Sequence, residues 1–181
     1  GDPLDESVNF GPLVSKRQLE IVQGFIAKGI AEGARLVAGG QREGDTGYYL
    51  QPTVFADATD DMTIATDEIF GPVLHVVTFK SNEIDAVIDA INATGYGLTF
   101  GLMTRIDDRV QHVTDRIHAG NIYVNRNQIG AIVGSQPFGG EGLSGTGPKA
   151  GGPFYLTRFA AVPAIEGVGV WAKAGDAKAL Q

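Results

Sequence analysis

Cysteine is absent from this 181-residue chain, which excludes disulfides, thiolate metal sites and a cysteine nucleophile within it. Basic residues are scarce: 14 Lys and Arg stand against 21 Asp and Glu, a net charge of −7, so we expect no nucleic-acid partner. No apolar run approaches the ~18 residues of a transmembrane helix, and the polar N-terminus has no signal-peptide pattern. We therefore expect a cytoplasmic protein without a transmembrane segment, of one domain or at most two small ones.

Glycine, by contrast, is abundant, with 26 residues, about twice its usual ~7% share. Nine of these glycines lie between Gly130 and Gly152. Each glycine costs backbone entropy on folding. Such a loop therefore indicates ligand binding by backbone N–H groups or close approach of another chain. The alternative is a flexible loop, against which Pro137, Pro148 and Pro153 argue by stiffening the segment.

Apolar residues spaced by three and four predict three helices. The first is capped by Ser15, the second by Ser81 or Asn82, and the third by Asp107 or Asp108. Short apolar runs predict strands at 36–38, 73–79, 98–104, 121–124 and 155–162, while Pro52 argues against a central strand at 48–55. Strands that alternate with helices of this length indicate an α/β fold with parallel strand pairs.

Two motifs bear on ligand chemistry. In Asp67-Glu68-Ile69-Phe70-Gly71-Pro72, Glu68 could accept hydrogen bonds from a diol while Phe70 offers a flat apolar wall to a ring; the alternative is a turn with a hydrophobic anchor. Gly140 to Gly145 spells G-x-G-x-x-G, but no strand precedes it and no helix opens in it, so it does not predict a dinucleotide turn.

Metal binding is not expected from this sequence, because metal sites need clusters of His, Cys and carboxylate ligands. The three histidines are His75, in a predicted strand, and His112 and His118, six residues apart near a predicted helix. We interpret all three as structural or surface residues.

Five short motifs follow one another along the chain in a recognisable order. They are Asn9-Phe10-Gly11-Pro12-Leu13, Gly47-Tyr48-Tyr49-Leu50-Gln51-Pro52-Thr53-Val54, Glu68-Ile69-Phe70-Gly71-Pro72-Val73, Tyr96-Gly97-Leu98 and Pro137-Phe138-Gly139-Gly140. Over roughly residues 1 to 165 the sequence resembles the aldehyde dehydrogenase superfamily. Residues 125–140 resemble the substrate-anchor loop of its L-glutamate γ-semialdehyde (Δ1-pyrroline-5-carboxylate) dehydrogenases. Residues 146–156 resemble the version in bacterial bifunctional proline utilization A enzymes.

The resemblance implies an NAD-dependent oxidation in which a cysteine thiolate attacks the aldehyde and a water, activated by a base, hydrolyses the thioester. It implies that Glu68 binds the nicotinamide-side ribose and that Phe70 packs near it. Gly130 and Ala131 would bind the substrate carboxylate through backbone N–H groups, and Phe138 would line the aldehyde pocket. FAD would belong to a bifunctional parent and not to this chain.

The resemblance also implies what the chain lacks. The nucleophile, the base and the Rossmann domain of the family precede the region that matches Gly1, so we expect no catalytic residue here. The fold class expected is α/β, a three-layer-like αβα portion of the catalytic domain, with residues 1–153 as its C-terminal portion. Residues 154–167 would be an oligomerisation strand and 168–181 a tail, and we expect a homo-oligomer.

Two functional interpretations stay open. The chain is a segment of a glutamate-semialdehyde dehydrogenase, inactive alone, or it is a stand-alone, non-catalytic module for binding or oligomerisation descended from such an enzyme. The presence of Glu68, Phe70 and the Gly130-Ala131 pair favours the first, because a purely structural descendant has no chemical need for them.

The purified chain should not oxidise glutamate semialdehyde, because without a cysteine no thiolate forms to attack the aldehyde. NADH absorbance during incubation with aldehyde and NAD measures this. Steady NADH production, with contaminating enzyme excluded, would show the prediction to be wrong.

Overall fold

A computed structural model describes residues 1–130 and 134–159 of the chain. The chain forms two compact units, Gly1–Asn82 and Glu83–Gln181. No shift in amino-acid composition marks this boundary. Among the described residues, no helix combines the length and apolarity needed to cross a bilayer.

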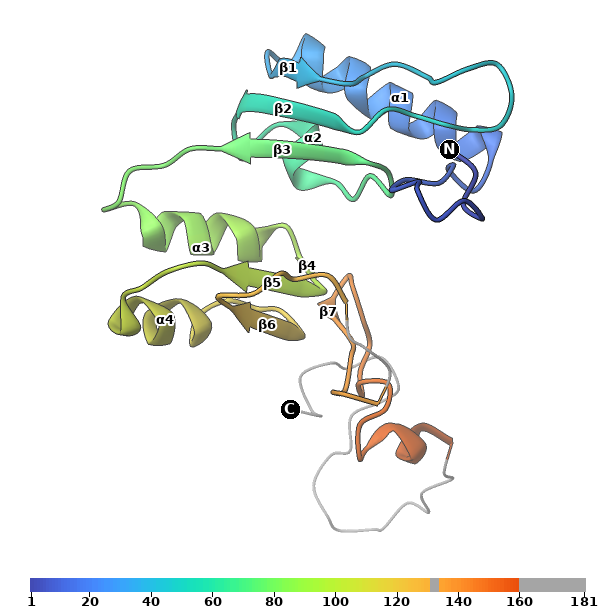
Figure 1. The fold of residues 1–181 in the computed structure, drawn as a ribbon. Helices are drawn as coiled ribbons and strands as arrows, with labels where there is room; N and C mark the ends of the chain where they lie inside the picture. The colour runs from blue at the N-terminus through green and yellow to red at the C-terminus, as the bar shows by residue number, and fades with distance from the viewer. Residues whose placement is uncertain (131–133, 160–181) are drawn as a thin grey trace, which may run out of the picture. The chain divides into compact units, whose positions relative to one another are not determined.

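The first unit is a three-stranded sheet with a long helix packed against it (Figure 1). Its elements are α1 (Lys16–Ala31), β1 (Arg35–Ala38), β2 (Thr53–Ala58), α2 (Thr63–Thr66) and β3 (Val73–Val77). The strand order is β1-β2-β3, with β1 antiparallel and β3 parallel to β2. The Ser15 hydroxyl accepts a hydrogen bond from the Gln18 N–H at 3.2 Å, which confirms the predicted cap of the first helix.

Strand β2 occupies the centre of this sheet, so the expectation drawn from Pro52 was wrong. Pro52 stands just before Thr53, the first residue of the strand, where its missing N–H interrupts no ladder bond. Thr53 in turn is buried, and its N–H donates to the Pro72 carbonyl at 2.8 Å.

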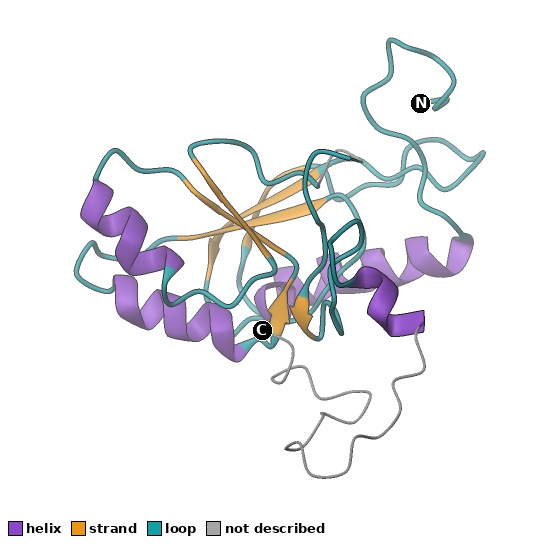
Figure 2. Cartoon of the chain, turned by 90° about the horizontal axis from the view of Figure 1, so that it is seen from below, coloured by secondary structure: helices purple, strands orange, loops and turns teal. Residues whose placement is uncertain are grey.

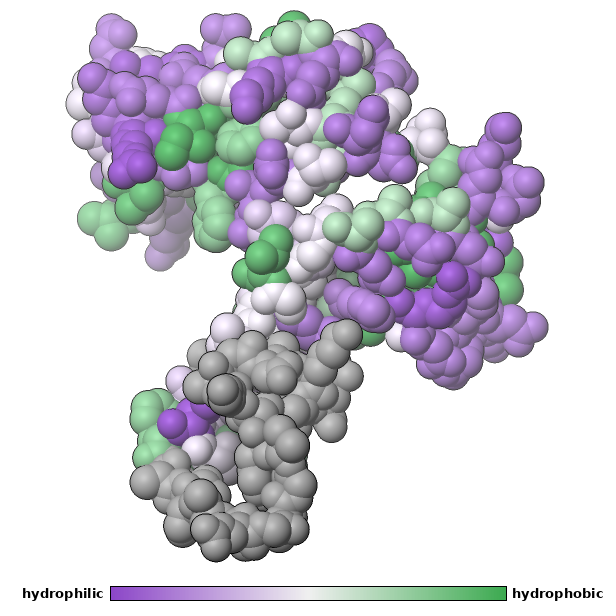
Figure 3. Space-filling view, turned by 180° about the vertical axis from the view of Figure 1, so that it is seen from behind, coloured by the Kyte–Doolittle hydropathy of each residue, from purple (hydrophilic) through white to green (hydrophobic). Residues whose placement is uncertain are grey.

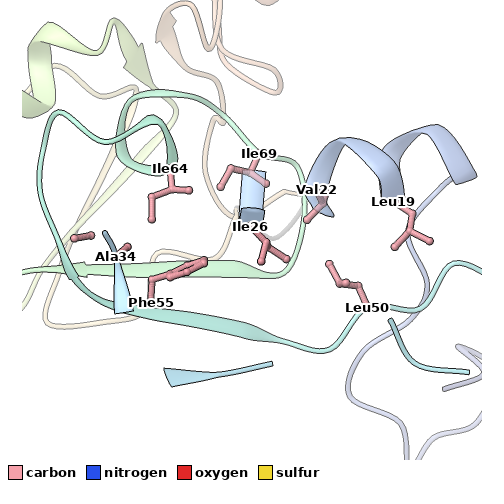
Figure 4. Close-up of a cluster of buried hydrophobic side chains, with 9 residues drawn as sticks. Leu19, Val22, Ile26, Ala34, Leu50, Phe55, Ile64 and Ile69 are labelled. Carbon is pink, nitrogen blue, oxygen red and sulfur yellow. The ribbon is translucent and has the colours of Figure 1, made fainter. Parts of the chain in front are cut away.

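The core of the first unit lies between α1 and β2. Val22 and Phe55 are fully buried there, and Ile64 of α2 and Ile69 complete the contact (Figure 4). Side chains alternate in direction along a strand. The opposite face of the sheet therefore carries Val37, Leu74 and Val76, which are 53%, 59% and 44% exposed. Apolar residues also reach the surface drawn in Figure 3, among the polar ones.

The second unit builds on two parallel strands, β5 (Thr99–Leu102) and β6 (Asn121–Val124). Helices α3 (Ile84–Ala93) and α4 (Asp107–Thr114) cover one face of this pair, where Ile88 and Val113 pack with Phe100 and Ile122 (Figure 2). A second, antiparallel pair joins β4 (Tyr96–Gly97) to β7 (Glu141–Gly142). The helices on small sheets and the parallel pairs confirm the predicted α/β class.

The predicted caps of the second and third helices were wrong. Helix α3 begins after Glu83 and α4 after Ile106, and neither has a side-chain cap. Ser81 and Asn82 lie in the turn before Glu83, too early to reach the first turn of α3. Asp107 and Asp108 lie inside the first turn of α4, where their negative charge complements the helix dipole.

The strand predicted at 155–162 is not present in its described part. Tyr155–Phe159 forms a 3-10 helix, η1, and residues 160–162 lie outside the described residues. Local hydrogen bonds favour this turn: the Tyr155 N–H donates to Gly152 at 3.1 Å, and the Arg158 guanidinium donates to the carbonyls of Thr146 and Gly147. A single strand has no such bonds unless another strand pairs with it.

Surface ion pairs link α3 to α4. The Asp85 carboxylate lies 2.5 Å from Nε2 of His112 and 2.5 Å from Nη1 of Arg116. The hydrogen bond with the His112 ring, together with the positive charge of Arg116, holds the pKa of Asp85 below its ordinary value. Because this pKa is lower in the folded chain than in the unfolded one, the ionised carboxylate favours folding, and the contribution is lost as the pH falls through the pKa.

Replacing this carboxylate, as in Asp85→Asn, should make the free energy of unfolding depend less on pH in acid solution. Below about pH 4, near the ordinary pKa of Asp, the free energy of unfolding should fall more steeply for the natural chain than for the variant. Thermal unfolding across this range measures the difference. Asp60→Asn is the control, since Asp60 has no ion pair or hydrogen bond within the described residues. Equal slopes for Asp85→Asn and the natural chain would contradict the prediction.

Candidate functional site

The segment from Glu68 to Pro72 connects α2 to β3 without regular secondary structure, and α1 holds it in place. Ile69, 9% exposed, points into the core beside Val22 (Figure 4). The side-chain amide of Gln18 donates to the Ile69 carbonyl at 3.0 Å and to the Phe70 carbonyl at 3.1 Å. The segment is therefore fixed by one apolar anchor and by two hydrogen bonds from one side-chain amide.

Two further features bind this segment closely to α1. A Cβ atom on Gly71 would lie 2.6 Å from Cγ2 of Val22, so only glycine lets the chain pass so near the helix. At the other end of α1, the Glu32 carboxylate accepts the Thr63 N–H at 2.7 Å and the Thr63 hydroxyl. Glu32 thus satisfies an N–H at the start of α2 from outside that helix.

Glu68 and Phe70 flank the buried Ile69 and are both exposed. Phe70 is 74% exposed, and its backbone has a φ of 53°, in the left-handed region. Within residues 1–130 and 134–159, the Glu68 carboxylate makes no hydrogen bond or ion pair. A free carboxylate and a free aromatic face two residues apart fit a ligand that carries hydroxyl donors beside a flat ring.

In the second unit, Asn121 of β6 positions Phe138. Its amide nitrogen donates to the Pro137 carbonyl at 3.0 Å, and its amide oxygen accepts the Gly139 N–H at 3.2 Å. Phe138 and Ala150 exchange a pair of backbone hydrogen bonds at 3.0 and 2.9 Å. The backbone on both sides of Phe138 is therefore fixed, and the residue itself is half-buried.

Asn125 directs the chain from β6 into the loop that holds Gly130. It adopts a φ of 56°, and its side-chain oxygen accepts the Thr104 N–H at 3.0 Å. The next residue, Arg126, lies with its guanidinium 4.6 Å from the ring centre of Tyr123, while the Tyr123 hydroxyl accepts from Gln136 at 2.6 Å. These contacts fix the loop at its start and again just before Phe138.

Packing within the chain explains three glycines of the loop and Gly120, which precedes it. A Cβ atom on Gly120, Gly140, Gly142 or Gly145 would collide with a carbonyl oxygen of Gly139, Ser144, Gly95 or Gly140, respectively. Backbone segments approach each other there more closely than any side chain permits. The ligand-binding interpretation of the glycine-rich loop is therefore unnecessary for Gly140, Gly142 and Gly145, while Gly120 lies before the loop.

Gly130 differs from these glycines. Its φ lies outside the left-handed region, and no atom of the described chain lies within 4 Å of the position of a Cβ atom. Within the described residues, neither backbone conformation nor packing requires glycine there. Ala131, the other predicted anchor residue, lies outside the described residues.

The predicted site residues thus fall in separate units: Glu68 and Phe70 in the first, Gly130 and Phe138 in the second. Sequence reasoning missed Gln18 and Asn121, the residues that hold these segments. A polar residue beside a helix cap or at the start of a strand is the only local signal that either gives.

His75 and His112 lie in different elements, β3 and α4. His75 is half-buried in β3, and this burial lowers its pKa. His112 pairs with Asp85. Across the described ranges, 1–130 and 134–159, no group of three or more His, Asp or Glu side chains is arranged to hold a metal ion.

Residues 1–165 match the model of the Aldehyde dehydrogenase family. The chain belongs to this family. It is 46% identical over 158 residues to the bifunctional protein PutA of Rhizobium meliloti, covering 87% of this chain and 13% of that protein. It is 49% identical over 150 residues to betaine aldehyde dehydrogenase of Rhizobium leguminosarum, covering 81% of this chain and 30% of that enzyme.

The fold agrees with these relationships. The structure of 1-pyrroline-5-carboxylate dehydrogenase from Thermus with bound NAD superposes with a TM-score of 0.76 at 42% identity, covering 82% of this chain and 28% of that one. The chain therefore spans less than a third of the length of each of these family members.

Proposed function

We propose that this chain is part of an NAD-dependent dehydrogenase that oxidises L-glutamate γ-semialdehyde to L-glutamate. The observation that carries the proposal is the Glu68–Phe70 pair, an unpartnered carboxylate and an exposed ring on a backbone that α1 holds in place. Similarity to PutA and to 1-pyrroline-5-carboxylate dehydrogenase supports this choice of aldehyde.

The first unit contributes coenzyme contacts in this proposal. When bound, NAD supplies the hydride acceptor for the oxidation. Glu68 accepts hydrogen bonds from the hydroxyls of the nicotinamide-side ribose, and Phe70 packs its ring beside them. Because these two residues cover only one end of the coenzyme, we expect NAD to bind the isolated chain weakly or not at all.

The second unit contributes substrate contacts. The backbone N–H groups of Gly130 and Ala131 bind the substrate carboxylate, and the open space beside Gly130 supports this assignment. Phe138, held by Asn121 through both neighbouring residues, lines the aldehyde pocket. An aldehyde with a distant carboxylate is thereby distinguished from one without.

The chain itself supplies no thiolate nucleophile, since its 181 residues include no cysteine. In the proposal the thiolate, the base and the Rossmann domain come from the rest of the dehydrogenase, and FAD belongs only to a bifunctional parent. The exposed apolar side chains of Val37, Leu74 and Val76 support further packing against that remainder. The alternative, a stand-alone module without catalysis, gives no chemical role to Glu68 and Phe70.

Assembly is part of the same proposal. Residues 1–153 form the catalytic-domain portion, residues 154–167 pair as a strand with a second copy, and residues 168–181 follow as a tail. The exposed rings of Phe154 and Phe159, 69% and 76% exposed, support a partner at this segment. The 3-10 turn at Tyr155–Phe159 would then convert to a strand on pairing.

Removing the carboxylate proposed to bind the ribose, as in Glu68→Ala in the complete dehydrogenase, should weaken NAD binding by about ten- to a hundredfold. The reason is the loss of charge-assisted hydrogen bonds, roughly 1.5–3 kcal/mol. Calorimetric titration with NAD measures the affinity. Asp67→Ala, which removes the neighbouring exposed carboxylate, is the control and should bind NAD as the natural enzyme does. An unchanged affinity in Glu68→Ala would refute the coenzyme role.

Enlarging the proposed anchor, as in Ala131→Met in the complete dehydrogenase, should lower kcat/KM for glutamate semialdehyde and leave a short aldehyde without a carboxylate nearly unaffected. The bulkier side chain obstructs the backbone N–H groups that hold the carboxylate. Steady-state kinetics with both aldehydes give the comparison. Equal losses on the two substrates would indicate a folding defect and remove the anchor role.

A further inference from the structure

We infer that Gln18 is a positioning residue for the coenzyme site. It acts through the backbone of Ile69 and Phe70 on the orientation of the Glu68 carboxylate. Its side-chain amide donates to both carbonyls, at 3.0 and 3.1 Å, from the first turn of α1. The inference rests on the proposed function, since it concerns the same site.

The backbone that Gln18 holds would not adopt this conformation unaided. Phe70 has a φ of 53°, which places a bulky aromatic residue in the left-handed region that normally suits glycine or asparagine. No strand or helix bonds hold residues 68 to 70. The Gln18 amide supplies a donor to two carbonyls that secondary structure leaves unpaired.

The left-handed turn determines where the flanking side chains go. Ile69 enters the core, while Phe70 keeps its ring 74% exposed and Glu68 remains outside. An exposed ring gains nothing from burial within the described chain, so the strain at Phe70 has no internal benefit to offset it. Strain of this kind that the surrounding structure maintains is characteristic of ligand-binding sites.

The neighbouring contacts restrict the segment without replacing Gln18. The buried Ile69 side chain anchors the segment in the core, and Gly71 lets its backbone lie close to Val22. Neither contact restrains the rotation of the peptide group between Phe70 and Gly71. The hydrogen bond to the Phe70 carbonyl is the contact that does, so losing it should disturb the orientation of Glu68 more than the core.

The test is a double-mutant cycle in the complete dehydrogenase, with NAD affinity by calorimetry and melting temperature as readouts. Gln18→Met keeps the length and helix propensity of the side chain but removes the donor. We expect it to weaken NAD binding by about three- to tenfold, the range for lost hydrogen bonds. Combined with Glu68→Ala, it should add no more than about twofold, because Gln18 acts through Glu68.

Gln23→Ala is the matched control, a glutamine on the same helix that is exposed and makes no side-chain hydrogen bond within the described residues. It should leave NAD affinity unchanged. Gln18→Ala is a second variant for the case in which Gln18→Met folds poorly, and the melting temperatures identify that case. If neither variant folds, the residue serves overall stability and the positioning role is overturned.

The remaining outcomes separate this inference from the proposed function. If Glu68→Ala weakens NAD binding and Gln18→Met does not, the inference fails while the proposed function stands. If the two losses multiply in the double variant, Gln18 acts independently of Glu68 and the positioning role is wrong. If Glu68→Ala itself leaves the affinity unchanged, the proposed coenzyme site fails.

Discussion

The packing of α1 against β2 and the segment after α2 is the contact on which the candidate coenzyme site depends. Val22 and Phe55 are fully buried at its centre, and Ile69 joins them from the loop. The loop has no ladder bonds of its own, so its shape follows from the helix it lies against. A rigid helix face thereby determines the position of an exposed carboxylate and an exposed ring.

The second unit achieves a similar result by different means. Here a strand residue, Asn121, holds the backbone on both sides of Phe138, and glycines at 120, 140, 142 and 145 let backbone segments approach closely. Burying carbonyls and amides side by side requires that they be paired. The side chain of Asn121 provides one donor and one acceptor in the geometry that this loop needs.

The helices and strands that could be predicted well are those whose sequence patterns lie within the element itself. Helix α1 follows from an apolar face and the Ser15 cap, and β3 from a run of β-branched residues. The strand expected at 155–162 depends on a partner strand, which a sequence does not supply, and the described part turned into η1 through bonds to Gly152 and Phe154. Pairing of β4 with β7 joins two-residue segments too short to show periodicity.

In the candidate site too, only the residues with a local sequence signal could be predicted. Glu68 and Phe70 attract attention as a carboxylate and an aromatic residue before Gly-Pro, whereas Gln18 becomes visible only once its partners, 51 and 52 residues away, are known. The glycine-rich loop was misleading in part. Composition alone does not distinguish a glycine that avoids a collision, such as Gly140, from one beside open space, such as Gly130.

Helix α1 also carries two contacts at opposite ends, Gln18 to Phe70 and Glu32 to Thr63. Fourteen residues separate Gln18 from Glu32, close to four full turns, so the two side chains emerge on nearly the same side, about 21 Å apart along the axis. Inserting or deleting one residue between them would rotate one contact by about 100° relative to the other. A change in the length of α1 would therefore misplace one of the two ends of the segment that this helix holds.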